Sequence, residues 1–128
     1  LDYAGESIPE DMQGVSLRAI FEQGDLENWR KSMYYRYWMA EDEHCVAPHY
    51  GVRTERYKLI CYYGPGLYSD GSYPEGTEEQ QWPQWELFDL KRDGHEIRNV
   101  YDDLEYSSVV DELKLELARL RKELKDED

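Results

Sequence analysis

Residues 49–61, HYGVRTERYKLIC, predict two short strands on either side of a turn at Glu55-Arg56. The turn lacks the Asn-Gly or Asp-Gly pair of a tight hairpin, so the register is a hypothesis. It places Val52 opposite Leu59 and Arg53 opposite Lys58. Alternation then divides the side chains between two faces: Tyr50, Val52, Thr54, Tyr57, Leu59 and Cys61 on one, and His49, Gly51, Arg53, Lys58, Ile60 and Tyr62 on the other.

The second of these faces gathers cations in a chain whose formal net charge is −14. Like charges placed directly opposite each other, as predicted for Arg53 and Lys58, cost about 0.2–1 kcal/mol. Two explanations are open. Neighbouring acids among the 29 Asp and Glu residues offset the two charges, or the face points at an anion or at an acidic surface of another domain.

Further elements flank this pair of strands. Met33–Met39 (MYYRYWM) has the aromatic composition of a strand that is covered on both faces, and residues 85–90 (WELFDL) predict another strand. Residues 17–24 have the apolar spacing of a short helix that ends at Gly. The sheet therefore has three or four strands, most of them antiparallel.

The C-terminal segment is the clearest helix, because apolar residues recur along it at intervals of three and four: Val109, Leu113, Leu117, Leu120 and Leu124. Ser108 and Asp111 match a helix-capping pattern. Three acids in residues 125–128 lie at the negative end of the helix dipole, so we expect the last turn to fray. The apolar stripe is too short for a coiled coil, which favours packing on the sheet.

Together these elements predict an α+β fold, a small antiparallel sheet of about four strands with a long C-terminal helix packed across one face. Twelve Tyr and four Trp residues supply large apolar area with polar tips, which suits both a core and an interface. The acidic balance argues against a general nucleic-acid binder and against an anionic membrane surface. No run of about 20 apolar residues is present to cross a bilayer.

The sequence offers little catalytic chemistry by itself. No Ser, His and Asp arrangement is readable as a triad, and no Gly-rich loop opens a helix after a strand. His44 and His49 flank an acidic loop, but the spacing matches no known metal site. Cys45 and Cys61 are not in CxxC spacing, so two partly buried free thiols are favoured over a disulfide.

Four separate motifs, in order along the chain, resemble the C-terminal end of the formylglycine-dependent sulfatases. They are IPEDMQGVSL (8–17), HYGVRTERYKLI (49–60), WELFDLKRDGHEIRNVYDD (85–103) and VVDELKLELARLRKEL (109–124). The family usually has Pro in the Asp-Pro-x-Glu turn, whereas this chain has Asp93-Gly94-His95-Glu96. Gly keeps the turn but loosens it.

The resemblance implies that the chemistry belongs to a large N-terminal catalytic domain. There a cysteine in a C-x-[PA]-S-R motif becomes formylglycine, and Asp and Asn side chains hold calcium. Neither Cys45 nor Cys61 lies in such a motif, so we expect neither cofactor in this chain and no activity from it alone. The expected partners are that catalytic domain and a sulfated sugar or aryl sulfate. His49, Arg53 and Lys58 are the implied substrate-proximal or domain-docking residues.

The same resemblance suggests a division of the chain. Residues 1–14 are expected to be the tail of the preceding catalytic domain and a linker, residues 15–128 the C-terminal subdomain, and residues 64–84 an irregular surface insertion. LDYAG at the start indicates a helix end, which suggests a fragment, and an excised subdomain should self-associate through its docking face. The parent's compartment is unknown, since similar sulfatases are often periplasmic, secreted or lysosomal and some are cytoplasmic.

Two other functions remain open beside a non-catalytic sulfatase subdomain. One is a freestanding binding or interaction module with the same fold, which would use exposed Tyr and Trp side chains as a partner site. The other is an independent enzyme based on His49 and neighbouring acids.

Overall fold

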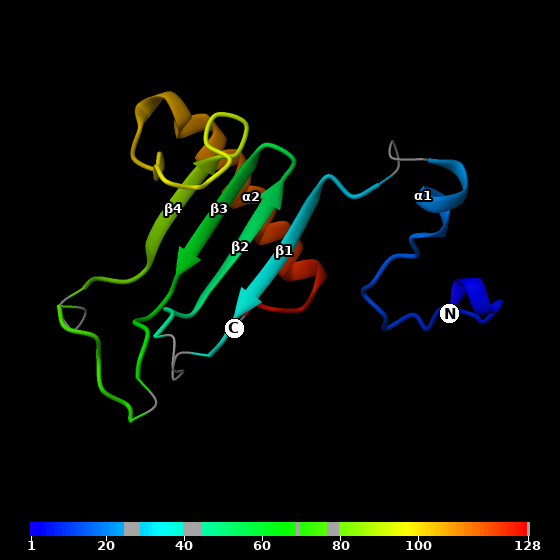
Figure 1. Cartoon of the computed structure of the whole chain (residues 1–128), viewed down its shortest axis with the longest axis horizontal. Coiled ribbons are helices and arrows are strands. Elements are labelled where there is room, and N and C mark those ends of the chain that lie inside the picture. The colour runs from blue at the N-terminus through cyan, green and yellow to red at the C-terminus, as the bar shows by residue number, and fades with distance from the viewer. Residues whose placement is uncertain (25–28, 40–44, 69, 77–79, 128) are drawn as a thin grey trace. The chain divides into compact units, whose positions relative to one another are not determined.

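The computed structural model describes residues 1–24, 29–39, 45–68, 70–76 and 80–127 (Figure 1). Residues Leu1–Lys31 and Ser32–Asp128 form two compact units. The predicted division at residue 14 stays a prediction. Residues 40–44, which include His44, lie outside the described residues, as do residues 69 and 77–79 of the predicted insertion.

The larger unit is a sheet with the strand order β1-β2-β3-β4, in which all neighbours are antiparallel. The strands are β1 (Ser32–Tyr37), β2 (His49–Thr54), β3 (Tyr57–Tyr62) and β4 (Gln84–Asp89). Val52 pairs with Leu59 and Arg53 with Lys58, which confirms the predicted hairpin register. The long helix α2 (Ser107–Glu123) crosses one face of the sheet (Figure 1), so the predicted fold class is confirmed.

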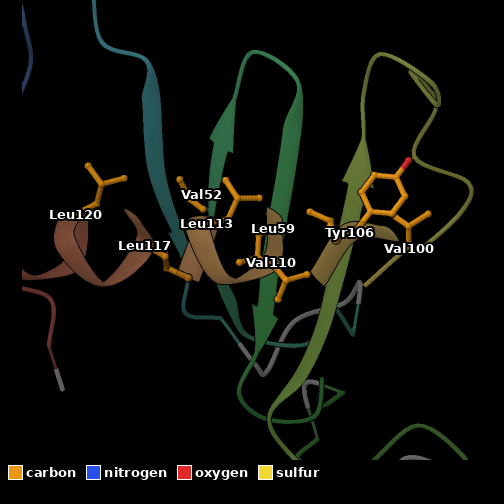
Figure 2. Packing of buried hydrophobic residues seen from close by; sticks show 9 residues of the cluster. Val52, Leu59, Val100, Tyr106, Val110, Leu113, Leu117 and Leu120 are labelled. Atoms are coloured by element: carbon orange, nitrogen blue, oxygen red, sulfur yellow. The ribbon is translucent and has the colours of Figure 1, made fainter. Parts of the chain in front are cut away.

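The core lies between the sheet and α2 (Figure 2). Val52, Leu59 and Leu87 form one cross-strand row and are fully buried. The helix contributes Val110, Leu113, Leu117 and Leu120 to the same cluster. Burial of one such side chain is worth about 2 kcal/mol, so this row and stripe supply most of the apolar stabilisation.

Both ends of α2 differ from their predicted form. The helix begins at Ser107, directly after the 3-10 turn η2 (Leu104–Tyr106), and no side chain caps it. The Ser108 capping prediction is therefore wrong, because η2 already leads the backbone into the helix. At the other end Asp126 accepts hydrogen bonds from Tyr34 and Arg36 on β1, so the acidic tail is bonded rather than frayed.

The N-terminal unit contains the 3-10 turn η1 (Asp2–Ala4) and the short helix α1 (Arg18–Gln23). Gly24 has a left-handed conformation, and its N–H bonds to Ile20 O at 3.0 Å, so the predicted helix stop is confirmed. No helix in the described part of the chain is long and apolar enough to cross a membrane.

A buried carboxylate joins three parts of the larger unit. Asp89 at the end of β4 is 2% exposed. Its carboxylate accepts hydrogen bonds from Arg56 Nε at 3.1 Å and from Arg56 Nη2 at 2.8 Å. Tyr106 Oη donates to the same carboxylate at 3.2 Å. These bonds lower the pKa of Asp89 to about 2, with Arg56 as the main cause. Asp89 therefore ties the β2–β3 turn to β4 and to the start of α2.

We expect Asp89→Asn to lower the free energy of unfolding at pH 7 by about 2–3 kcal/mol, because Arg56 and Tyr106 lose a charged acceptor. The Asp89 pKa is depressed in the folded state, so its stabilisation is present above the unfolded value of 3.8 and is lost as the pH falls toward about 2. Urea unfolding of both proteins across this range measures the difference.

Asp103→Asn is the matched control, because Asp103 pairs with Arg98 at the surface. We expect that change to cost less than about 0.5 kcal/mol. A difference between wild type and Asp89→Asn that stays constant from pH 7 to pH 2 would contradict the assigned role of the carboxylate.

Candidate functional site

The sheet face opposite α2 carries all three residues that the sequence predicted as site residues. We call it the open face, and its cross-strand rows are Met33–Arg53–Lys58–Phe88, Tyr35–Gly51–Ile60–Glu86 and Tyr37–His49–Tyr62–Gln84. Strand alternation places these rows on the opposite side from the core row of Val52 and Leu59. The open face therefore combines aromatic rings, one histidine and two cations.

His49 lies within a group of tyrosine rings. Its ring stacks on Tyr37 at 5.5 Å between centroids, meets Tyr62 at 5.2 Å and meets Tyr35 edge-on at 6.0 Å. His49 Nδ1 is 2.8 Å from Ala47 O, and a carbonyl oxygen only accepts, so Nδ1 carries the proton. In the neutral form of the ring, Nε2 is then the nitrogen that accepts a hydrogen bond from a partner.

Gly51 allows Tyr35 to lie across the middle row. A Cβ at residue 51 would be 2.5 Å from Leu59 O and 2.6 Å from Tyr35 Oη, which leaves no space for any larger residue. Tyr35 Oη is buried and has no hydrogen-bond partner among the described residues. Burial raises the pKa of Tyr35, and the nearby Tyr62, Glu96 and Glu86 raise it further.

Tyr62 and Glu86 form a polar pair beside these rings. Tyr62 Oη donates to Glu86 Oε2 at 3.0 Å. Burial raises the pKa of Tyr62 to about 12, and the Glu86 charge adds to the shift. Tyr62 is therefore a hydrogen-bond donor at neutral pH and does not act as a base there.

The two opposed cations have different surroundings. Lys58 Nζ lies 2.5 Å from Glu96 Oε2, so a neighbouring acid balances its charge. Arg53 is exposed, and no residue described in the structure forms an ion pair or hydrogen bond with its side chain. The first of the two sequence explanations thus accounts for Lys58, whereas Arg53 remains available to an outside anion.

The loop after β4 positions Glu96. Asp93 Oδ2 accepts the N–H groups of Ile97 at 2.7 Å and Arg98 at 2.8 Å, and these bonds hold the pKa of Asp93 below its usual value. Within this turn Glu96 has φ 55, an uncommon conformation for a residue with a side chain. The Asp93-Gly94-His95-Glu96 turn therefore places the carboxylate that neutralises Lys58.

Sequence reasoning missed the tyrosines, Glu86 and Glu96 as parts of this face. The alternation within MYYRYWM was hidden because nearly every residue is large, yet Tyr35 and Tyr37 share one face and Tyr34 and Arg36 the other. The partner of Lys58 lies 38 residues further along the chain, and no local spacing predicts that contact.

The described residues do not fit a sulfatase cofactor site. They contain no group of three or more His, Cys, Asp or Glu side chains that would hold a metal ion. Cys61 is buried and burial raises its pKa, which disfavours a reactive thiolate. Cys45 is followed by Val-Ala-Pro, which is not the motif expected for a formylglycine.

A four-stranded antiparallel sheet with one helix across it defines a small α+β domain. Residues 1–70 and 77–123 match the family model described as N-sulphoglucosamine sulphohydrolase, C-terminal. The chain belongs to this family of C-terminal sulfatase domains.

Known proteins agree with this assignment. An N-acetylglucosamine-6-O-sulfatase of Bacteroides thetaiotaomicron is 35% identical over 130 residues, which span 100% of this chain and 20% of that protein. A solved structure in complex with its substrate D-glucosamine-2-N,6-O-disulfate has a TM-score of 0.82 at 34% identity, over 99% of this chain and 23% of that one. A 2-O GAG sulfatase structure has a TM-score of 0.67 at 28% identity, over 98% and 23%. The chain thus spans about a fifth of the curated relative's length.

We expect Gly51→Ala to lower the free energy of unfolding by about 2 kcal/mol, because the new methyl group must displace Tyr35 and the backbone at Leu59. Thermal unfolding measures the effect. Gly94→Ala is the control, since its Cβ would meet nothing closer than Leu90 O at 3.6 Å. Equal melting temperatures for the two variants would show that the close approach of Tyr35 is unimportant.

Proposed function

We propose that this chain is the non-catalytic C-terminal subdomain of a sulfatase that hydrolyses sulfate esters of amino sugars. In this proposal the open face docks on a catalytic domain and completes the rim of its substrate cleft. Formylglycine and calcium belong to that domain, and none of the catalytic steps takes place on this chain. Sulfated sugars and aryl sulfates are the expected substrates of the whole enzyme.

The observation that carries the proposal is the position of Arg53 on a face that α2 leaves uncovered. The Arg53 guanidinium is exposed and has no acidic partner among the described residues, in a chain of net charge −14. A guanidinium binds two oxygens of a sulfate ester at once. His49 lies two rows further along the same strand, beyond Gly51, and in its neutral form offers Nε2 as an acceptor for a sugar hydroxyl. Lys58 contributes less in this arrangement, because Glu96 holds it.

The curated relative supports the substrate class. It is a sulfatase of an amino sugar, and the substrate printed for the similar structure is a disulfated glucosamine. Both proteins are about four to five times longer than the matched region, which supports a catalytic domain outside residues 1–128.

The alternative is a freestanding binding module that uses the same face. Met33 is 41% exposed at the edge of the open face, and Trp38 is 65% exposed just beyond β1, so apolar surface is available for a partner. Self-association of the isolated chain through this surface is expected under both hypotheses, and sedimentation at several concentrations tests it.

An activity assay separates the two functions. We expect the 128-residue chain not to hydrolyse an aryl sulfate in the presence of added calcium, because it lacks a formylglycine motif. We expect a longer product of the same reading frame to hydrolyse the ester if it carries a C-x-[PA]-S-R motif. Turnover by the 128-residue chain alone would overturn the proposal, and a reading frame that starts just before Leu1 would favour the binding module.

The role of Arg53 is tested in the longer product. We expect Arg53→Ala to lower kcat/KM for a sulfated glucosamine by about tenfold, mainly through KM, because one charge-assisted contact is lost. Arg119→Ala is the control, since Arg119 lies on the exposed side of α2 and pairs with Glu116 and Glu123. An equal kcat/KM for the two variants would show that Arg53 does not contribute to substrate binding.

A further inference from the structure

A second cationic site lies on the other side of the sheet. Between one flank of α2 and the adjacent ends of the strands there is a trough, which is lined by Tyr50, Trp85, Lys114, Leu117, Ala118 and Arg121. Tyr50 and Trp85 flank Cys61 in one cross-strand row, Tyr50–Cys61–Trp85. Alternation separates this row from the open face, so the trough is distinct from the surface of His49 and Arg53.

The helix supplies the charges of the trough. Lys114, Ala118 and Arg121 follow at intervals of four and three residues, so they share one flank of α2. The two cations are about 10 Å apart along the helix axis. Ala118 between them is exposed and small, so the flank between the cations is not obstructed.

Both cations lie over aromatic rings. Lys114 Nζ is 4.5 Å from the Trp85 ring centroid, 5.0 Å from that of Tyr101, and donates to Tyr101 Oη at 2.6 Å. Arg121 lies 4.4 Å from the Tyr50 centroid, and its Nε donates to Asp126 O at 2.8 Å. No carboxylate of the described residues forms an ion pair with Lys114. The ammonium charge is therefore held in place without being neutralised.

The field of these cations reaches the floor of the trough. Arg121 and Lys114 both act on the Cys61 thiol and oppose the rise in its pKa that burial causes. Arg121 and Arg36 act in the same direction on Tyr50, whose pKa burial nonetheless raises to about 12. Asp126 accepts a hydrogen bond from Arg36, and its negative charge partly offsets the positive charges near Arg121.

We infer that this trough is a binding site for a sulfate-bearing sugar. Such a ligand joins anionic oxygens, which the two cations attract, to a ring whose C–H groups pack on tyrosine and tryptophan. The choice of a sugar rests on the proposed function, whereas the preference for an anion rests on the trough alone. A site here, away from the open face, would hold a sulfated chain to the enzyme while another residue of that chain occupies the catalytic cleft.

The test uses titration calorimetry on the 128-residue chain with D-glucosamine-2-N,6-O-disulfate, D-glucosamine and inorganic sulfate. Ala118→Glu and Ala118→Gln are a matched pair of nearly equal size, and thermal unfolding verifies that both remain folded. We expect the disulfated sugar to bind the Glu variant about tenfold more weakly than the Gln variant, because only the first places a negative charge between the cations. Lys114→Gln is a second variant, with a similar expected loss.

Three results would overturn the inference. Equal affinities of the Glu and Gln variants for the disulfated sugar would show that charge does not determine binding, even if both variants bind it more weakly than wild type. If inorganic sulfate binds as tightly as the disulfated sugar, the sugar ring does not contribute to the affinity. Loss of binding in Arg53→Ala, with retention in Ala118→Glu, would assign the ligand to the open face.

The inference and the proposed function fail separately. In the longer product, turnover of a small aryl sulfate by the wild type tests the proposed function. The affinities of the Ala118→Glu and Ala118→Gln variants for the disulfated sugar test the trough. Absence of turnover in the longer wild-type product would contradict the proposed function alone, because binding by the trough is measured without catalysis.

Discussion

The register between β2 and β3 is the constraint on which the other features of the larger unit depend. Val52 opposite Leu59, extended to Leu87 on β4, builds the buried row against α2. Since side chains alternate along a strand, this row also determines that His49, Arg53 and Lys58 lie on the opposite face. A slip of β2 by one residue would turn Arg53 toward α2 and Val52 away from it, which makes the register strongly specified.

Charge is distributed over this frame in a way that the net value of −14 conceals. Several cations are neutralised locally, as Arg56 is by Asp89 and Lys58 by Glu96. Two cations without an acidic partner among the described residues lie on opposite faces of the sheet. Arg53 is exposed on one face, and Lys114 lies over rings on the other. An acidic protein that leaves these charges unbalanced presents two local attractions for anions within an otherwise repulsive surface.

The sequence was sufficient for the fold because the signals involved are local and periodic. The hairpin register, the strand at residues 85–90 and the long helix follow from alternation and from helical spacing, and the structure confirms each of them. One of the two errors comes from a neighbouring element and the other from a distant contact. Ser108 had a capping pattern, but η2 already starts the helix, and the acidic tail is bonded because Asp126 reaches Tyr34 and Arg36 on β1.

The candidate sites were less predictable, because they are made by side chains that are distant in sequence. Spacing alone indicated the opposed pair Arg53 and Lys58 but gave no reason to distinguish the two. That distinction comes from Glu96, which a turn after β4 places beside Lys58. The trough likewise needs β2, β4 and α2 together.

The sheet thus separates the open face from the trough beside α2. Successive residues on a strand belong alternately to these two surfaces. On β2, His49 contributes to the open face while Tyr50 lines the trough, although they are adjacent in the chain. Substitutions at alternate positions should therefore affect one surface and leave the other in place, provided that Val52 and Leu59 keep the register. For a domain that spans about a fifth of its curated relative, the proposed docking on a catalytic domain and the proposed capture of a charged ligand would not compete for the same residues.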